Sequence, residues 1–124
     1  MDVEVIGTAL DEALVRKACV LAAGSAGIED AHVAIEFVDA VRIAELNAEF
    51  RGKEGPTDVL SFPVDEHGPA HGPRELGDVV ICPEHTGDLL EAVVHGVLHL
   101  TGMDHETDEG EMLALQAEIR AWLS

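Results

Sequence analysis

Basic residues are scarce in this 124-residue chain, which has 7 Lys and Arg against 25 Asp and Glu and a formal charge of −18 at pH 7. Proteins that bind nucleic acid usually carry a basic stripe, because neutralising phosphates supplies much of their affinity. Composition taken alone therefore argues against a nucleic-acid partner. Attraction for an anion has to be local, and five of the seven basic residues precede residue 54: Arg16, Lys17, Arg42, Arg51 and Lys53.

The sequence also lacks the patterns typical of a disulfide framework or a membrane span. The two cysteines, Cys19 and Cys82, stand far apart without C-x-x-C spacing. That pattern predicts two buried thiols in a reducing compartment. No apolar run approaches the ~20 residues of a membrane span, and the first residues show no secretory signal. We therefore expect a cytoplasmic protein with no membrane partner.

The apolar content is sufficient for one domain. Hydrophobic residues make up 47% of the chain, which is typical of globular proteins rather than disordered ones. A chain of this length suits a single domain. We expect one domain that spans residues 1–124.

Hydrophobic periodicity predicts an α+β fold. Alternating apolar residues predict four strands, at residues 2–7, 32–38, 58–62 and 76–82. Helical spacing predicts four helices, the first capped by Asp11 and the others opening at Asp39, at Asp88 and near Thr107. A stretch rich in Gly, Pro and His, residues 65–74, predicts an exposed loop. This order indicates a small mixed four-stranded sheet packed with helices.

Three histidines gather in the string H-G-V-L-H-L-T-G-M-D-H near the C-terminus. His95 and His99 are one helical turn apart, so a helix projects both imidazoles from one face. Gly102 can end that helix and reverse the chain, which returns His105 toward the first two rings. Three converging imidazoles predict a zinc site with an open fourth position on the C-terminal helix and its following turn.

The histidine pattern also allows simpler interpretations. A pair four residues apart can arise by chance in a chain with seven histidines. A third histidine after a glycine turn, among apolar neighbours, makes chance a poor explanation of the whole string. The remaining loop histidines are interpreted as solvated side chains: His67, His71 and His85.

One class of zinc peptidases has the same histidine spacing, with a Glu directly after the first histidine as general base. Here Gly96 takes that position and has no side chain to accept a proton, which argues against peptide hydrolysis by that mechanism. Asp104 and Glu106 flank His105 and could substitute as a base. We favour two other roles for them: orienting histidine ring N–H groups, or forming the acidic first turn of the last helix.

Two of the few cations, Arg51 and Lys53, stand at the predicted end of the second helix. Arg51 presents a planar fork of donors that suits phosphate, and a phosphodiester under attack needs its developing charge stabilised. Taken alone, both cations are explained as well by favourable placement at a helix C-terminus. Thr57 and Asp58 are predicted turn residues, and Asp58 could pair with Arg51.

Three strings cover most of residues 46–106: L-N-x-x-F-R-G-K-E-x-P-T-D-V-L-S-F-P, L-G-D-V-V-I-C-P and H-G-V-L-H-L-T-G-M-D-H-E. Together they resemble the YbeY family of metal-dependent endoribonucleases, which act in ribosomal RNA maturation. The resemblance implies an α+β hydrolase with Arg51 as catalytic residue and one zinc ion per chain, bound by His95, His99 and His105. Met103 departs from the family, which usually has an aromatic residue there, and the segment between residues 83 and 95 is shorter.

The resemblance also implies a biological setting. The substrate would be single-stranded RNA rather than DNA, and the role would be small-subunit rRNA processing and ribosome quality control. The partners would be the small ribosomal subunit and its assembly proteins, in a bacterial cytoplasm. Two other interpretations are an assembly factor whose metal is chiefly structural and a zinc peptidase or amidase.

The net charge predicts how such an enzyme meets RNA. The acidic residues concentrate after the histidine string, especially at residues 104–111, and we expect them to lie away from the cleft. Arg51, Lys53 and the metal would then form one local positive cleft. We expect weak intrinsic affinity for free RNA, with the metal or a partner needed for productive encounter.

Overall fold

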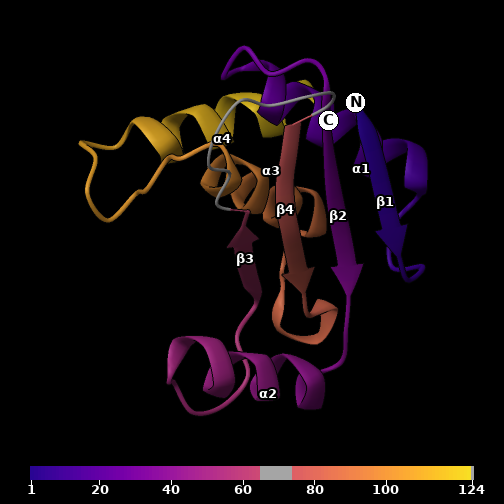
Figure 1. Cartoon of the computed structure of the whole chain (residues 1–124), viewed down its shortest axis with the longest axis vertical. Helices are drawn as coiled ribbons and strands as arrows, with labels where there is room; N and C mark the ends of the chain where they lie inside the picture. The colour runs from indigo at the N-terminus through magenta and orange to yellow at the C-terminus, as the bar shows by residue number, and fades with distance from the viewer. Residues whose placement is uncertain (65–73, 124) are drawn as a thin grey trace.

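Four strands form one mixed sheet in the order β1-β2-β4-β3 (Figure 1). The strands are β1 (Asp2–Ile6), β2 (Ala31–Phe37), β3 (Val59–Pro63) and β4 (Arg74–Ile81). β2 is parallel to both β1 and β4, whereas β3 pairs antiparallel with β4 and forms one edge. The coordinates are a computed structural model that describes residues 1–64 and 74–123. The predicted α+β class with a mixed four-stranded sheet is confirmed.

Four α-helices and one short 3₁₀ helix complete the described part of the chain: α1 (Glu12–Gly24), α2 (Ala40–Arg51), η1 (Pro83–His85), α3 (Leu89–Leu100) and α4 (Glu111–Trp122). The predicted starts of the first three α-helices, at Asp11, Asp39 and Asp88, are confirmed. The carboxylates of Asp11, Asp39 and Asp88 each accept a hydrogen bond from a backbone N–H in the first turn. Such caps satisfy N–H groups that a helix otherwise leaves unpaired.

The last helix begins later than predicted, at Glu111 instead of near Thr107. Gly110 is the N-cap and has a φ of 101°, so a left-handed residue separates the acidic segment from the helix. The carboxylate of Asp108 accepts hydrogen bonds from the N–H groups of Gly110 and Met112. These bonds lower the pKa of Asp108. Residues 104–109 therefore form a turn ahead of the helix rather than its first turn.

Two other sequence predictions concern β4 and the loop before it. Arg74 opens β4, two residues before the predicted start. Residues 65–73 of the predicted exposed loop, including His67 and His71, lie outside the described residues. His85, in η1, is exposed as predicted.

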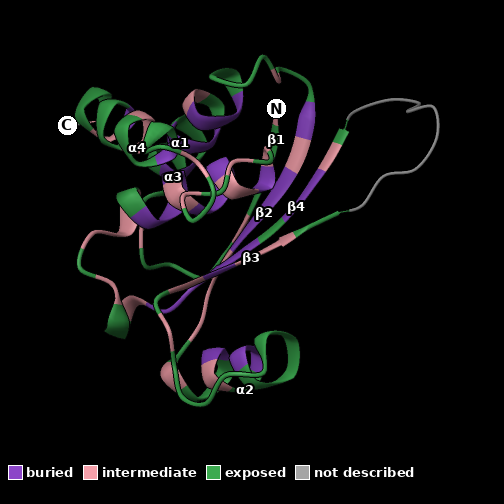
Figure 2. Cartoon of the chain, turned by 90° about the vertical axis from the view of Figure 1, so that its left-hand side faces the viewer, coloured by how far each residue is buried: buried purple, intermediate pink, exposed green. Residues whose placement is uncertain are grey.

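Helices α1 and α3 pack on one face of the sheet, and α4 packs against both of these helices on the same side of the sheet (Figure 2). Helix α2 contributes Ile43 and Leu46 to a second, smaller apolar cluster with Leu60 and Val80 of the opposite sheet face. Side chains alternate between faces along a strand, so β4 contributes to both clusters. No helix in the described part of the chain is long and apolar enough to span a membrane.

Both cysteines are buried, as predicted for small apolar side chains. Cys19 lies in the larger core cluster and Cys82 in the smaller one. Burial raises the pKa of the Cys19 thiol to about 12. Cys19 is therefore a packing residue rather than a reactive thiolate at neutral pH.

Gly96 allows α3 to lie close to the sheet. A Cβ atom at this position would overlap the Cγ1 methyl of Val79 on β4. We predict that Gly96→Ala lowers the free energy of unfolding by about 1–2 kcal/mol, because overpacking a core costs about 1–3 kcal/mol and better helix propensity returns up to about 1. Urea denaturation measures the difference.

Gly24→Ala is the matched control for this substitution. Gly24 is also helical, but nothing lies within 4 Å of a Cβ placed there. We expect this variant to be as stable as the parent protein or slightly more stable. Equal unfolding free energies for Gly96→Ala and Gly24→Ala would show that α3 does not need the close approach.

Candidate metal centre

The three histidines of the sequence motif converge in the structure. His95 and His99 lie one turn apart on α3, and His105 lies on the loop between α3 and α4. A ligand nitrogen can be chosen from each ring so that all three lie within 4.8 Å of one another. The ring centroids are 4.7 to 5.3 Å apart. The predicted reversal is also present, since Gly102 has a φ of 106° directly after the end of α3.

Hydrogen bonds orient two of the rings for a metal. Nδ1 of His95 lies 2.6 Å from Oε1 of Gln116, and Nδ1 of His99 lies 3.0 Å from the carbonyl oxygen of Met103. Both oxygens only accept hydrogen bonds, so each Nδ1 carries the proton and each Nε2 keeps a free lone pair. Burial, with a smaller contribution from His95, lowers the pKa of His99 and favours its neutral, ligating form.

This donor set fits a metal ion. Three half-buried imidazoles, two of them with a second-nitrogen partner, are the arrangement that zinc sites in proteins use. Imidazole also suits copper and nickel, so the ligands favour a transition metal over magnesium or calcium. Three residues of the described chain can hold the ion and leave further positions for water or substrate.

The expected orienting role of Asp104 and Glu106 is wrong. Oδ1 of Asp104 accepts a hydrogen bond from the N–H of Glu106 and so shapes the loop. The acceptors for the rings of His95 and His99 are Gln116 and the Met103 carbonyl, which the sequence patterns did not indicate. Gln116 lies on the same face of α4 as the buried Met112 and Ile119. A polar side chain on the inward face of this helix was the sequence signal that could have identified it.

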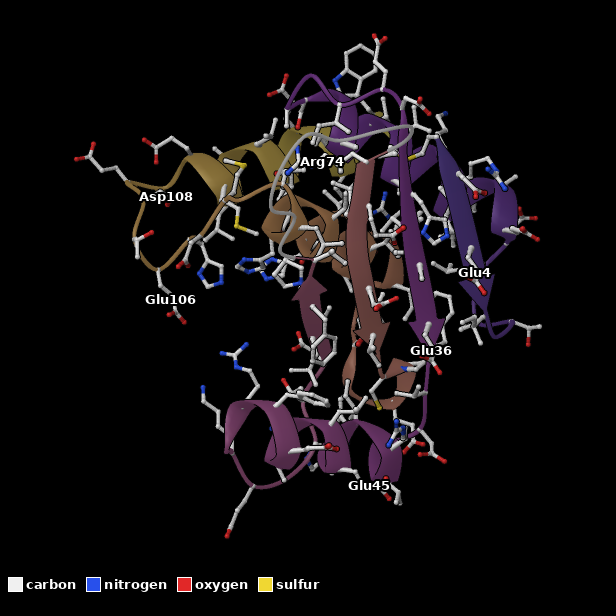
Figure 3. All side chains as sticks on the ribbon, in the orientation of Figure 1. Glu4, Glu36, Glu45, Arg74, Glu106 and Asp108 are labelled. Carbon is white, nitrogen blue, oxygen red and sulfur yellow. The ribbon has the colours of Figure 1, made fainter. Side chains whose placement is uncertain are left out.

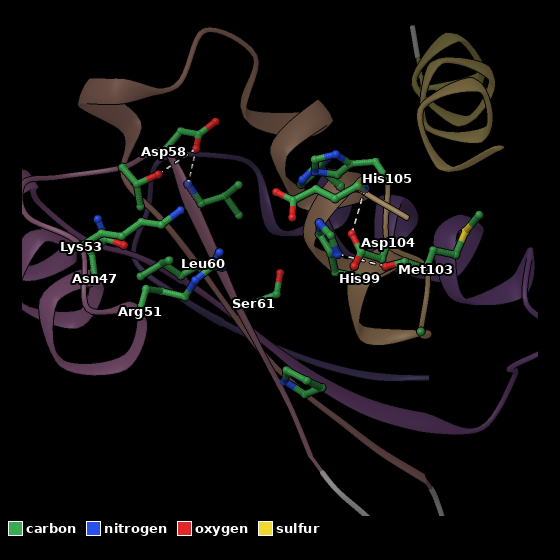
Figure 4. A pocket seen from close by; sticks show the side chains of 16 residues that line it. Asn47, Arg51, Lys53, Asp58, Leu60, Ser61, His99, Met103, Asp104 and His105 are labelled. Carbon is green, nitrogen blue, oxygen red and sulfur yellow. Dashed lines mark hydrogen bonds between the residues drawn. The ribbon is translucent and has the colours of Figure 1, made fainter. Parts of the chain in front are cut away.

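A cavity of about 630 Å³ adjoins the histidines (Figure 4). All three histidines line it, and Figure 4 shows His99 and His105 on one side, Arg51 and Lys53 on the other, and residues of β3 between them. The chain thus brings the predicted catalytic arginine to the same cavity as the predicted metal ligands. Asp104 and Glu106 also line this cavity, so the expectation that the acidic segment lies away from the cleft is wrong for these two residues.

The more distant acidic residues lie at the periphery of the molecule. Figure 3 shows Asp108 at the outer end of the loop after α3, and Glu4, Glu36 and Glu45 on the strands and α2. The cavity itself contains charged side chains of both signs. Arg51 and Lys53 lie on the α2 side and Asp104 and Glu106 on the loop side, but Asp58 also lines the cavity, near Lys53 (Figure 4).

Buried Asn47 fixes the segment that carries the cations. Its side-chain N–H₂ donates a hydrogen bond to the carbonyl of Gly55. Its backbone carbonyl accepts a hydrogen bond from the N–H of Lys53. Gly52, with a φ of 64°, ends α2 directly after Arg51, as predicted. The side of the cavity that carries Arg51 and Lys53 is thus tied to α2 by hydrogen bonds within residues 47–55.

The suggested Asp58–Arg51 pair is absent from the ion pairs found within residues 1–64 and 74–123. The carboxylate of Asp58 instead accepts hydrogen bonds from the N–H of Val59 and the hydroxyl of Thr57, which is the turn role predicted for these residues (Figure 4). Arg51 is an exposed residue at the cavity. Its guanidinium is accessible to a ligand there.

The space around Gly96 argues against the peptidase interpretation. The peptidase base would occupy position 96, where even a Cβ atom overlaps Val79. A glutamate at that position cannot be accommodated without moving α3 away from β4. The fold therefore excludes the base from the position that those peptidases use.

Comparisons with known proteins identify the family. A family model described as endoribonuclease YbeY matches residues 3–124. A curated endoribonuclease YbeY of Salinispora tropica is 44% identical over 119 residues, which cover 76% of each chain. That of Persephonella marina is 42% identical over 107 residues, 74% of this chain and 70% of the relative. In the Corynebacterium efficiens relative, 43% identical, the match covers only 57% of its length.

A solved structure supports the same fold. The solution structure of TM1509 from Thermotoga maritima matches with a TM-score of 0.61 and 27% identity. The match covers 98% of this chain and 88% of the other. The family model spans nearly the whole chain and includes the histidine cluster and the cavity that Arg51 lines. The chain therefore belongs to the endoribonuclease YbeY family and is a nuclease of the hydrolase class.

Proposed function

We propose that this protein is a zinc-dependent endoribonuclease that cleaves single-stranded RNA during ribosomal RNA maturation and ribosome quality control. One observation carries the proposal: three convergent imidazoles and an accessible arginine line the same cavity. Membership of the endoribonuclease YbeY family supports RNA as the substrate class.

The residues of the cavity have separate roles in this proposal. His95, His99 and His105 hold one zinc ion. A bound zinc ion supplies Lewis-acid chemistry, since it polarises phosphate oxygens and lowers the pKa of water. Arg51 binds the scissile phosphate with its fork of N–H donors and neutralises the charge that develops there.

The charge distribution determines how RNA reaches the site. The protein carries a formal charge of −18, and Asp104 and Glu106 lie at the cavity itself. Only the side lined by Arg51 and Lys53 attracts phosphate, so RNA is expected to approach from the α2 side. Affinity for free RNA is then low, and the small ribosomal subunit with its assembly proteins, in a bacterial cytoplasm, would position the substrate.

Cleavage assays on defined oligonucleotides test the proposal. Protein is depleted of metal with a chelator and reloaded with zinc, then mixed with labelled single-stranded RNA, the matched duplex and single-stranded DNA. We expect cleavage of single-stranded RNA only after zinc is restored, and none of the duplex or DNA. Equal cleavage by the metal-free protein, or no cleavage by the loaded protein, would contradict the proposal.

Binding across a salt series tests the charge argument separately. Weak binding to arbitrary RNA is expected, because few phosphates can be neutralised by two clustered cations. Tight, strongly salt-dependent binding to arbitrary RNA would contradict the expected approach to the site.

A further inference from the structure

Helix α4 supplies a contact to the histidine cluster that is distant in sequence. Gln116 lies on α4, 21 residues after His95, and its Oε1 lies 2.6 Å from Nδ1 of that histidine. His99, by contrast, uses the Met103 carbonyl four residues ahead of it, within the turn that ends α3. The orientation of His99 is therefore set locally, whereas that of His95 depends on how α4 packs against α3.

Contacts one helical turn before and one turn after Gln116 fix the position of α4. One turn before it, Met112 is buried in the main core, and one turn after it Arg120 donates a 2.8 Å hydrogen bond to Asp88, the N-cap of α3. Figures 1 and 2 show α4 packed alongside α3. Gln116 is half-buried between these contacts. These contacts hold the part of α4 that carries Gln116 beside α3.

The acceptor on Gln116 determines which ring nitrogen of His95 is free. A neutral imidazole has one N–H and one lone pair. Because Oε1 accepts the Nδ1 proton, the lone pair is on Nε2. Without this acceptor the ring can take the other tautomer or rotate, and both changes remove a ligand atom from the cluster.

We propose that Gln116 is the positioning residue for His95 and that it makes metal affinity depend on the docking of α4. The proposal rests on the three-histidine metal site of the proposed function. His105 strengthens the dependence, because it lies on the loop that joins the two helices and α4 fixes the far end of that loop. Two of the three ligands are then placed by one helix–helix contact.

Three variants distinguish the effect of the Gln116 hydrogen-bond acceptor from the effect of side-chain packing. Gln116→Leu keeps the size of the side chain and removes the acceptor. Gln116→Glu keeps an acceptor at the same reach. Glu118→Leu, at an exposed position of the same helix, is the matched control for the change to leucine. For each variant, zinc affinity is measured by competition with a chromophoric chelator, and the visible spectrum is recorded with cobalt(II) in place of zinc.

The expected zinc affinity of Gln116→Leu is about 10–100-fold weaker than that of the parent protein, the usual effect of losing a histidine's second hydrogen bond. Its cobalt spectrum should also change, because the geometry around the metal is altered. Gln116→Glu should bind zinc as tightly as the parent or more tightly, since a carboxylate accepts the same proton. Glu118→Leu should behave as the parent does.

Parent-like affinity and spectrum in Gln116→Leu would overturn the proposal, as would a loss in Gln116→Glu equal to that in Gln116→Leu. Thermal melting of the metal-free variants shows whether α4 still packs. If Gln116→Leu does not fold, Gln116→Ala replaces it, since alanine favours the helix and adds no bulk. A parent protein that binds zinc but cleaves no RNA would overturn the proposed function and leave this inference intact.

Discussion

Replacing His99 with alanine should abolish both tight zinc binding and RNA cleavage. His99 is the second of the three ligands in sequence, and its half-buried ring lies 4.7 Å from that of His95 and 5.3 Å from that of His105. Its removal leaves two imidazoles, one from α3 and one from the loop. Charge stabilisation by a metal is worth several kcal/mol, and each 1.36 kcal/mol is a factor of ten in rate. We expect cleavage to fall by about 10³-fold or more.

Metal analysis of the purified protein and a cleavage assay on single-stranded RNA measure the two losses. His85→Ala is the matched control, because His85 is an exposed histidine in η1 and does not belong to the cluster. This control should keep the metal content and activity of the parent protein. Undiminished metal content in His99→Ala, or no transition metal in the parent protein, would contradict the assignment of the metal ligands.

Local patterns explain why the metal ligands could be predicted from sequence. The spacing of His95 and His99 and the turn at Gly102 act within eleven residues, so helix geometry and the reversal after α3 already indicate that the three rings can converge. The same holds for the N-caps at Asp11, Asp39 and Asp88. Each of these features depends on backbone geometry that neighbouring residues determine.

Contacts between distant elements could not be predicted in the same way. Gln116 contacts His95 only because α4 packs on α3, and no spacing rule links those two positions. Arg51 reaches the cavity because β3 is the edge strand next to β4 and α3 packs against β3. The sequence indicated the residue types but not the strand order that brings them together.

The position of the charged side chains around the cavity was the feature that the sequence predicted least well. The total of −18 suggested repulsion of RNA, and the acidic loop after α3 was expected to lie away from the cleft. In the structure Asp104 and Glu106 line the cavity opposite Arg51 and Lys53. Asp58 lines it as well, so the cavity carries charges of both signs rather than being uniformly positive. This arrangement gives Arg51 a larger role, since few other cations can offset the nearby carboxylates.

Arg51→Ala should lower RNA cleavage by about 10²–10³-fold, the usual effect of removing one donor to a developing negative charge. Arg51 is an exposed residue at the end of α2, and the metal ligands lie on α3 and the loop after it. Zinc content and melting temperature should therefore be unchanged. Arg51→Lys should restore activity only in part, because an ammonium group lacks the planar fork that binds two phosphate oxygens.

Arg42→Ala is the matched control for charge, since Arg42 is an exposed arginine of the same helix and pairs on the surface with Glu45. It should cleave RNA as the parent protein does. Cleavage rates, zinc content and thermal melting of the three variants distinguish an enzyme from an assembly factor with a structural metal. Selective loss of cleavage in Arg51→Ala requires that the arginine act in the reaction. Parent-like cleavage in that variant would remove Arg51 from the mechanism, while a joint loss of metal and stability would make its role structural.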